Sequence, residues 1–514
     1  MKVVIQLSLL ALFCRCSLVQ STRTLKQTLT PSPPYKVLIA GAGPAGLLTA
    51  HAFLQHSRKH SPKPLYHIHI IDAKGDPRNS DSASSRSYSL GLNIRGQNAI
   101  NYFDLDDEKK SLRGIWNTIK KEGVESDSFY LHIGQKLKLQ IRKPIPKSQS
   151  SATSPPPTLL IPRYRLCAAL LDTLDAATSI SPSNESPSLE ISFNTSLASV
   201  DLESRTAYFA NDASEKYDLI IGSDGVNSPL RKQMTLPTAE GGHQPIVAEE
   251  ILLPGQFKVM QQSPHPVALE SDAVHAMEST DSTTNSSDRF NMFLIPAPGN
   301  STCAILSWKG TDTPPALAEG SDPAVANSAI EKLFPQFGTS SPAALQQLLS
   351  QRPSEVRTVR CNRYHSSAGG ALLLGDAAHS TGGALGQGAN SALQDVVQLA
   401  RCLEKCTLER SGEAEVDMPA VLKEFSSTQV AEGLALFQLL QLPPKGPSGL
   451  FYQFVQLLLG ALINIPGVGR FFPKPTQIML SQSLTSFSEI VHKNQFWINM
   501  ATKNIRVIHY EPEQ

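Results

Sequence analysis

Residues 35–57, YKVLIAGAGPAGLLTAHAFLQHS, decide the fold of this chain. A short apolar strand pattern runs into a Gly-x-Gly-x-x-Gly turn at 41–46, and a helical pattern follows. In such a turn the first glycine makes the tight bend, the second lets the backbone approach a pyrophosphate, and the third lets the helix pack on the strand. Free N–H groups at the helix start then face the phosphates. We therefore predict a dinucleotide site with the contacts Gly41, Gly43, Ala45 and Gly46.

A second strand pattern follows at 65–73, LYHIHIIDA, and completes a strand–helix–strand unit. It ends at Asp72, where a carboxylate can accept hydrogen bonds from a ribose. This unit predicts a Rossmann-like α/β domain that begins at Tyr35, with Asp72 as a further cofactor contact.

The composition argues against one class of partner. The chain has 514 residues, 40% of them hydrophobic, and a formal net charge of +1. That length supports one large domain or two to three smaller ones. Nucleic acid binding calls for a concentrated basic surface, and no basic run interleaved with aromatic residues occurs. We expect no nucleic acid partner.

The first 34 residues are typical of a targeting leader. Lys2 precedes an apolar stretch at 3–13, and the stretch after it is rich in Ser and Thr. No Asp or Glu occurs before Asp72, so a secretory signal and an organellar transit peptide both fit. We expect a leader over 1–34 that addresses an organelle or the endomembrane system and lies outside the fold.

The rest of the chain alternates between strand and helix patterns. SLEISF, LASVDLE and TAYFAN, between 188 and 210, predict a small antiparallel meander, and YDLIIGSDG (217–225) predicts a buried strand ending in a glycine turn. From 391 onward the pattern is mainly helical. We predict four segments: a dinucleotide-binding domain with insertions at 35–240, an inserted sheet domain at 241–354, the dinucleotide-binding domain again at 355–415, and a helical region at 416–514.

A second glycine-rich stretch, LLLGDAAHSTGGALGQGANSALQD, occupies 372–395. Asp376, after Gly375 at the end of a buried strand, can accept hydrogen bonds from the hydroxyl chain that joins a flavin ring to its phosphate. Gly386, Gly388 and Ala389 leave room for backbone against the ring edge. The helix after them would point its positive N-terminus at the cofactor.

Three stretches resemble class A flavoprotein monooxygenases: GDAAHSTGGALGQGANSALQD (375–395), DLIIGSDGVNSPLR (218–231) and RYRLCAALL (163–171). The resemblance implies a discontinuous Rossmann-like FAD-binding domain with an inserted substrate sheet, and it adds Arg163 and Asp224 to the FAD contacts. It also implies NADPH or NADH as a transient reductant, and the absence of a second Gly-x-Gly-x-x-Gly from the sequence agrees with this. Oxygen would then add to the reduced flavin to give a hydroperoxide that hydroxylates the substrate.

Within that family the kynurenine 3-monooxygenase branch is most similar, at 76–96, 290–306 and 486–497. The resemblance implies that Arg86 grips a substrate carboxylate and that Asn390 contacts substrate as well as flavin. Both are predicted active-site residues. The implied substrate is a small aromatic or conjugated molecule, expected to carry a carboxylate, and O2 is the co-substrate.

The chain departs from the family pattern in three places. Gly383 replaces a proline of the flavin motif, so Gly383→Pro should be tolerated if the backbone φ is compatible. Asp127 falls where a second cofactor-side arginine is expected, and Gln477 falls near a substrate-binding tyrosine. Two alternatives therefore stay open: a flavoprotein acting on an apolar isoprenoid, and a flavin-binding protein without hydroxylase activity.

Other patterns point to structure more than to chemistry. His67 and His69 share a strand face without a third ligand, so no metal site is predicted, and His379 is interpreted as structural. The apolar stretch at 450–465 is shorter than the roughly 20 residues of a membrane-spanning helix. It predicts a buried helix over the substrate cavity or, alternatively, a surface that dips into a membrane.

Overall fold

The computed structural model describes residues 33–79, 87–104, 114–134, 137–142, 154–179, 188–237, 243–279, 289–383, 385–410, 413–463, 465 and 469–503. The chain from Tyr35 onward forms one compact unit. Nearly all of the predicted leader lies outside the described residues, so the leader and its cellular address stay predictions.

A five-stranded sheet forms the centre of this unit, in the order β18-β12-β1-β2-β8 with every neighbouring pair parallel. Most of its side chains are buried on both faces, as expected for parallel strands covered by helices. β18 enters from far along the chain and pairs with β12, which confirms the discontinuous Rossmann-like domain. The strands are β1 (Tyr35–Ala40), β2 (Tyr66–Asp72), β8 (Ser188–Phe193), β12 (Leu219–Gly222) and β18 (Ala371–Leu373).

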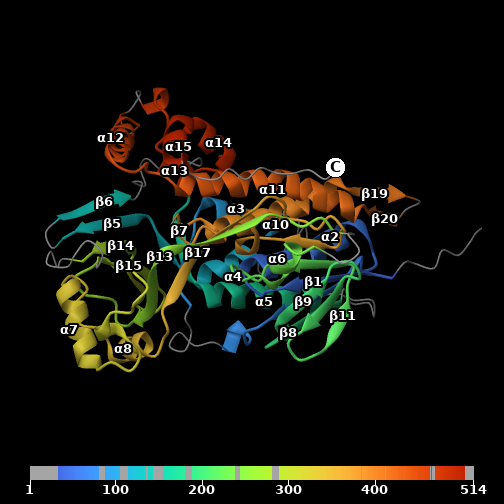
Figure 1. Ribbon diagram of the computed structural model, residues 1–514, viewed down its shortest axis with the longest axis horizontal. Helices are drawn as coiled ribbons and strands as arrows, with labels where there is room; N and C mark the ends of the chain where they lie inside the picture. The colour runs from blue at the N-terminus through green and yellow to red at the C-terminus, as the bar shows by residue number, and fades with distance from the viewer. Residues whose placement is uncertain are drawn as a thin grey trace, which may run out of the picture. The chain divides into compact units, whose positions relative to one another are not determined.

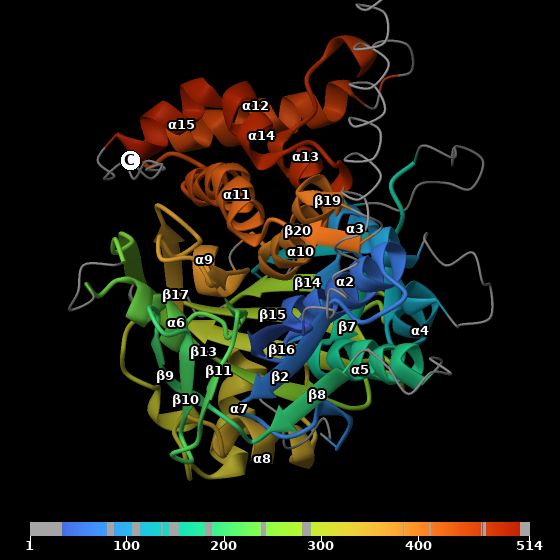
Figure 2. The same ribbon diagram turned by 90° about the vertical axis from the view of Figure 1, so that its right-hand side faces the viewer.

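Helices cover this sheet and hold its parts together. α10 packs against α2, α3 and α11, so the helix of the flavin motif lies against the helix of the first glycine turn (Figure 2). The helices of this region are α2 (Pro44–His60), α3 (Ile94–Asp104), α4 (Ile115–Lys121), α5 (Arg163–Ser179), α6 (Pro229–Met234), α9 (Asp376–His379) and α10 (Gly388–Lys405).

The predicted meander is correct in type but one strand out of place. β9 (Leu197–Asp201), β10 (Thr206–Phe209) and β11 (Ser214–Lys216) form the antiparallel sheet. The preceding segment, SLEISF, is β8, and it pairs in parallel with β2 as the edge of the central sheet. An edge strand is only partly covered, so its alternating pattern is the same as that of a meander strand.

A seven-stranded sheet, in the order β17-β13-β16-β15-β14-β5-β6, forms the second layer, and α8 packs on β13 (Figure 1). It extends beyond the predicted 241–354 at both ends. β5 pairs with β14, and β17 pairs with β13 as far as Cys361. The elements are β5 (Ser128–Ile133), β6 (Leu137–Arg142), β13 (Ala248–Gln262), β14 (Ala273–Glu278), β15 (Phe290–Ala297), β16 (Ser301–Trp308), β17 (Ser354–Cys361), α7 (Pro323–Leu333) and α8 (Pro342–Leu349).

The C-terminal part is helical, as predicted, and α11 runs along α10 (Figure 1). A hairpin of two short strands precedes α11, and a separate three-stranded sheet has the order β3-β7-β4. These elements are β3 (Ser89–Leu92), β4 (Val124–Ser126), β7 (Thr158–Pro162), β19 (Thr407–Arg410), β20 (Glu413–Val416), α11 (Met418–Leu440), α12 (Pro447–Leu462), α13 (Thr476–Gln482), α14 (Phe487–Lys493) and α15 (Gln495–Thr502).

Candidate active site

The first glycine turn connects β1 to α2 and requires its glycines. Gly41 has φ +106°, and a Cβ there would lie 2.5 Å from the carbonyl oxygen of Ser223. A Cβ on Gly46 would lie 2.0 Å from the Gly41 oxygen, because helix and strand pack closely. α2 starts after Gly43 without a side-chain cap, so its first N–H groups are available to an anion. The geometry fits the predicted pyrophosphate contact.

Asp72 lies at the end of β2 and joins that end to the glycine turn. Its Oδ2 accepts the N–H of Ala42 at 2.8 Å, and its Oδ1 accepts the N–H of Lys74 at 2.8 Å. A carboxylate has about four acceptor positions. Asp72 therefore holds the turn and still has capacity for the predicted ribose contact.

Arg163 and Asp376 bring the first glycine turn and the flavin motif together. A Cβ on Gly43 would lie 3.0 Å from an Nη atom of Arg163, so this guanidinium lies against the turn. Burial raises the pKa of Asp376, and the neighbouring charges of His379 and Arg163 partly oppose the rise. Arg163 is half-buried. Burial lowers its pKa, but the nearby Cys167, Tyr88, Asp72 and Asp376 together outweigh this and raise the pKa above its usual value. The Arg163 guanidinium and the Asp376 carboxylate thus lie close enough to affect each other's pKa, although they are far apart in the sequence.

The start of α10 forms another wall of the predicted cofactor site. Gly388 opens the helix, and a Cβ there would lie 3.6 Å from Oδ1 of Asp376. Gln387 provides no side-chain cap, so the first N–H groups of α10 are available. Gly386 has φ +61°, which favours glycine. Ala389 is half-buried beside them, and Gly375 precedes Asp376 with φ +58°.

Asn390 is buried and bonded to backbone on both sides of the motif. Its Nδ2 donates to the carbonyl oxygens of Gly91 at 3.0 Å and Gly386 at 3.1 Å, and its Oδ1 accepts the N–H of Asn93 at 3.1 Å. These bonds join β3 to the start of α10. Asn390 therefore positions two walls of the site, and its predicted contact with substrate stays a prediction.

Asp224 provides a direct test of whether the site fits a cofactor. Both carboxylate oxygens are buried, and neither has a hydrogen-bond partner among the described residues. Burial raises the pKa of Asp224 to about 6, although Ser228 and Arg231 lower it. A Cβ on Gly41 would lie 2.9 Å from the backbone N of Asp224, so the backbone at Asp224 passes directly beside the glycine turn. A buried acceptor without a donor costs stability unless a ligand or water supplies one. The site thus fits a bound group with hydroxyl or N–H donors, as FAD has.

Asp224→Asn should stabilise the cofactor-free protein at alkaline pH and weaken FAD binding. The folded pKa is raised above the usual 3.9, so its contribution to stability is present below pH 4 and is lost as pH rises through about 6. Asparagine carries no charge, and we expect a gain of about 1–3 kcal/mol at pH 8 and less at pH 4.5. Urea unfolding of the FAD-free protein measures this. The exposed Asp172 supplies the control, Asp172→Asn, and equal pH dependence of Asp224→Asn and wild type would contradict the interpretation.

Arg86 lies outside the described residues, so its contact with a substrate carboxylate stays a prediction. The segment directly after Arg86 contacts two strands of the seven-stranded sheet. The Ser87 carbonyl accepts Nε2 of Gln261 in β13, and the Ser89 N–H lies 3.4 Å from Sγ of Cys303 in β16. Burial and the nearby Asp376 raise the pKa of Tyr88, while Arg163 lowers it. The segment therefore runs between the seven-stranded sheet and the flavin motif.

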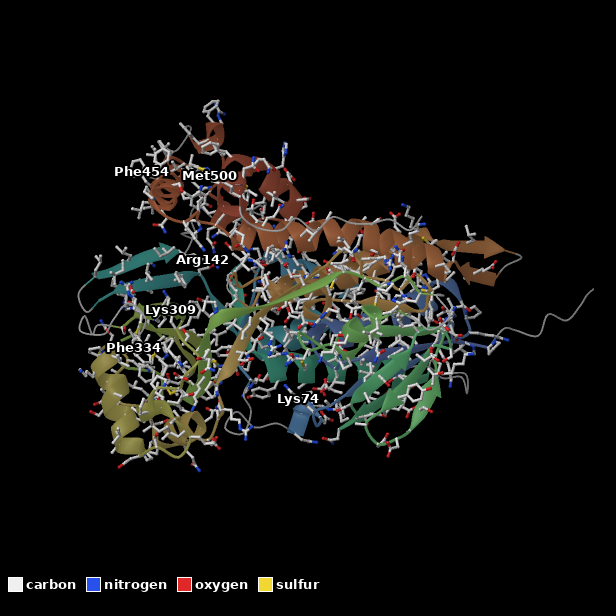
Figure 3. All side chains as sticks on the ribbon, in the orientation of Figure 1. Lys74, Arg142, Lys309, Phe334, Phe454 and Met500 are labelled. Carbon is white, nitrogen blue, oxygen red and sulfur yellow. The ribbon has the colours of Figure 1, made fainter. Side chains whose placement is uncertain are left out.

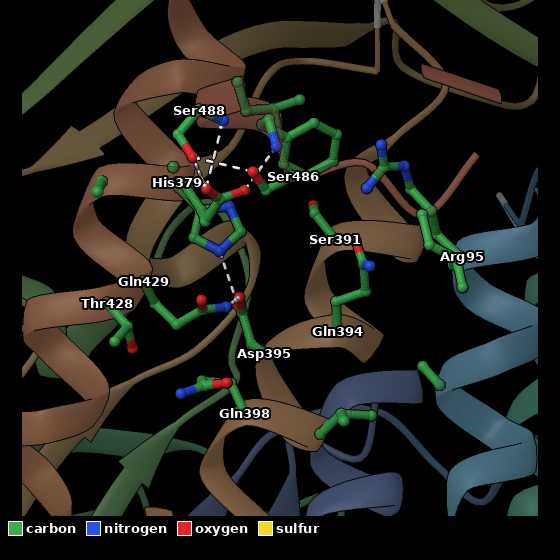
Figure 4. Close-up of a pocket in the computed structure, with 18 of the residues that line it drawn as sticks. Arg95, His379, Ser391, Gln394, Asp395, Gln398, Thr428, Gln429, Ser486 and Ser488 are labelled. Atoms are coloured by element: carbon green, nitrogen blue, oxygen red, sulfur yellow. Dashed lines mark hydrogen bonds and ion pairs between the residues drawn. The ribbon is translucent and has the colours of Figure 1, made fainter. Parts of the chain in front are cut away.

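A buried ion pair lies behind the flavin motif, in a cavity of about 470 Å³ between α10, α11, α3 and α14 (Figure 4). Nε2 of His379 contacts Oδ2 of Asp395 at 2.6 Å, and the same oxygen accepts the Gly375 N–H at 2.9 Å. Oδ1 accepts Nε2 of Gln429 from α11 at 2.7 Å. Burial lowers the pKa of His379, but Asp395 outweighs it and raises the pKa above its usual value. Sequence reasoning identified His379 as structural and missed Asp395 and Gln429, which lie in helical patterns without a distinctive motif.

The three departures from the family pattern have different outcomes. Gly383 has φ +78°, whereas proline requires about −65°, so the condition set for tolerating Gly383→Pro is not met and the substitution should strain this turn. Asp127 pairs with Arg142 of β6, with Nη2 and Oδ1 3.1 Å apart. An arginine therefore reaches this place from another strand, which the sequence did not indicate. Gln477 is exposed on α13.

One cluster of possible metal ligands occurs within the described residues, although none was predicted. It comprises His56 and His60 of α2 and Glu404 of α10. Each has a protein partner: His56 bonds Tyr66 and Thr407, and Lys59 and His60 both lie 2.9 Å from Oε2 of Glu404. The absence of a metal site stays a prediction.

Comparison with known proteins agrees with this geometry. Residues 111–418, more than half of the chain, match the family described as FAD binding domain. A kynurenine 3-monooxygenase of Phaeosphaeria nodorum is 25% identical over 399 residues, which are 72% of this chain and 71% of the relative. A kynurenine 3-monooxygenase of Xanthomonas euvesicatoria is 25% identical over 388 residues, 73% of each chain.

Solved structures share the fold. A tetrameric 2-methyl-3-hydroxypyridine-5-carboxylic acid oxygenase superposes with a TM-score of 0.54 at 16% identity, over 82% of this chain and 96% of the other. Klebsiella pneumoniae HpxO, solved with FAD and uric acid, superposes with a TM-score of 0.52 at 15% identity, over 78% and 86%.

Proposed function

Because the chain belongs to the FAD binding domain family and is an FAD-dependent monooxygenase of class A, we propose that it hydroxylates a small aromatic or conjugated carboxylate. NADPH or NADH is the electron donor, and O2 supplies the oxygen atom. The observation that carries the proposal is the course of the segment after Arg86, which runs between the seven-stranded sheet and the flavin motif.

Bound FAD would supply the electron transfer and the activation of oxygen. The N–H groups at the starts of α2 and α10 would hold its negatively charged parts, while Asp72 and Asp376 would accept its hydroxyl groups. Asp224 would gain the donors that the protein alone does not provide. The remaining task of the chain is to orient the substrate and to exclude water from the reacting atoms.

A substrate carboxylate is favoured by the predicted role of Arg86. A guanidinium binds a carboxylate through two parallel hydrogen bonds, which fixes both position and orientation. The curated relatives named kynurenine 3-monooxygenase support an aromatic substrate. The exposed Gln477 stands near the place of a family tyrosine, so kynurenine itself should bind weakly, and a different acid should be the best substrate.

Arg86→Met should weaken the best aromatic acid by at least about tenfold and leave its amide unaffected, because a charge-assisted bond contributes about 1.5–3 kcal/mol. The measurement is flavin reduction and oxygen uptake with NADPH across a panel of aromatic acids and matched amides. Arg78→Met is the matched control, since Arg78 pairs with Asp76 and Asp175 and needs no substrate. If amides are used as well as acids, or if Arg86→Met leaves the acid unchanged, the carboxylate anchor is wrong.

One observation favours a second candidate. The C-terminal helices expose a large apolar surface, which would suit an enzyme that takes an apolar isoprenoid from a lipid phase. The same panel separates the two candidates if it includes isoprenoid lipids. Turnover of lipids alone would favour the second candidate, a flavoprotein epoxidase or related oxidoreductase that acts on an isoprenoid, whereas coupled hydroxylation of an aromatic acid favours the first proposal.

A further inference from the structure

Three side chains of the kinds that bind metal ions meet at the C-terminal ends of α2 and α10. α2 contributes His56 and His60, and α10 contributes Glu404. One ligand atom of each lies within 4.8 Å of the other two, and this is the one such group in the part of the chain that the structure describes. β19, which follows α10, lies at the opposite end of the unit from Arg142 and Phe334 (Figure 3). The cluster is therefore separate from the flavin motif and from the seven-stranded sheet.

The spacing of the two histidines suits a metal ion. Residues four apart lie on the same face of a helix, and the ring centroids of His56 and His60 are 4.6 Å apart. Two histidines at this spacing, with a carboxylate from a second element, form a three-ligand set that is common for zinc, with water in the fourth position. Imidazole nitrogens favour zinc and similar ions over Mg²⁺ and Ca²⁺. The ligand set therefore indicates Zn²⁺.

His56 is neutral and has a hydroxyl group beside each ring nitrogen. Burial, followed by the neighbouring His60, lowers the pKa of His56 to about 4, so the ring carries no charge at pH 7. Nδ1 lies 3.0 Å from the Tyr66 hydroxyl and Nε2 lies 2.9 Å from the Thr407 hydroxyl. Either nitrogen can bind a metal while the other donates to its hydroxyl, which fixes the ring. Nε2 of His60 lies 2.9 Å from Oε2 of Glu404, close to the roughly 3.3 Å that separates two ligands of a tetrahedral zinc ion.

We propose that His56, His60 and Glu404 bind a Zn²⁺ ion that ties the C-terminal end of α2 to that of α10. The Glu404 carboxylate and the partial negative charge at both helix ends favour a cation there. This inference replaces the expectation from the sequence that the chain has no metal site, which considered only His67 and His69. It does not depend on which substrate the enzyme uses.

Lys59 competes with the metal for Glu404. Its Nζ lies 2.9 Å from Oε2 of Glu404, the same oxygen that contacts His60. The Lys59 side chain is 52% exposed, so it can turn into solvent when zinc binds. Lys59→Met should therefore tighten zinc binding by about two- to fivefold, because an exposed ion pair no longer has to be broken. Lys36→Met is the control, since Lys36 pairs with Glu215 elsewhere, and it should leave the affinity unchanged.

Equilibrium dialysis of the FAD-loaded full chain against Zn²⁺, followed by metal analysis, measures the number of bound ions and their affinity. His60→Ala and Glu404→Gln should each lower the affinity by at least about tenfold, because each removes a ligand. His492→Ala is matched to the first variant, since it also removes a histidine from the last turn of a helix. Glu424→Gln is matched to the second, since Glu424 and Glu404 are similarly exposed and both pair with a lysine. Both controls should bind zinc as wild type does.

Thermal unfolding gives a second measurement. Zn²⁺ should raise the melting temperature of wild type and of both controls, but not that of His60→Ala or Glu404→Gln, because only an ion bound to the folded chain stabilises it. Unchanged FAD absorbance confirms that each variant folds. The proposal fails if wild type binds no zinc, or if His60→Ala and Glu404→Gln keep the wild-type affinity, which would place the ion elsewhere. It also fails if Lys59→Met binds zinc no more tightly than wild type, since the ion would then not use Glu404.

Discussion

Asp376→Ala is expected to give a folded protein that loses its FAD during purification. Asp376 is the first residue of α9. Its carboxylate lies beside Gly388 and close to the charge of Arg163. The carboxylate would accept hydroxyl groups of the cofactor in a site with little water. Such a charge-assisted bond contributes about 1.5–3 kcal/mol, and each 1.4 kcal/mol is tenfold, so we expect FAD affinity to fall roughly a hundredfold. The ratio of flavin to protein absorbance measures the loss.

The fold should survive this change. In the cofactor-free chain burial raises the pKa of Asp376 above its usual value, so its charge is unfavourably placed until a ligand binds. The melting temperature without FAD should therefore be unchanged or higher in Asp376→Ala. The exposed Asp272 provides the control, Asp272→Ala, which should retain the cofactor. Full occupancy of Asp376→Ala by FAD would remove Asp376 from the site.

Asp395→Ala should destabilise the folded protein by about 3–5 kcal/mol, the cost of breaking a buried ion pair by removing one partner. Asp395 is buried and accepts three hydrogen bonds, from Gly375, His379 and Gln429. The change also releases the N–H of Gly375, directly before Asp376, so FAD affinity should fall as well. Urea unfolding at pH 6 gives the free energy of unfolding.

The double variant Asp395→Leu with His379→Leu separates the pair from simple loss of packing. Replacing both partners of a buried pair by apolar residues is often close to neutral. We expect the double variant to be more stable than Asp395→Leu alone, with a clear coupling energy in the cycle that the two single leucine variants and the double variant form with wild type. Additive effects of the two positions would show that the pair does not act as a unit.

The pair also has a defined pH dependence. The pKa of His379 is raised in the folded protein, so its stabilisation is complete below the ordinary histidine value of about 6.5 and is lost as pH rises through the folded value. Wild type should therefore lose stability from pH 6 to pH 9 in excess of the double variant. An equal loss in both proteins would assign the dependence to other groups.

The sequence alone determined the features that local backbone geometry demands. Gly41 and Gly46 were predicted because a tight turn and close helix packing need residues without a side chain, and the structure has this geometry. Gly386 was predicted to leave room beside a flavin ring, and its positive φ is a further reason for glycine there. The parallel central sheet and the helical C-terminal part were also predicted, because apolar periodicity is a property of a short window. These requirements are met within a few residues, so they appear in the sequence.

Only the tertiary structure decided which distant groups meet. Arg163 lies against Gly43, and Asp395 joins His379 to Gln429, because the chain brings β18, α10 and α11 together. No local pattern specifies such a contact. The same holds for α12, where Leu450, Phe454 and Leu457 are exposed: an apolar helix pattern is identical whether a neighbour covers it or solvent does. Burial is set by what packs against a surface, and that depends on the whole fold.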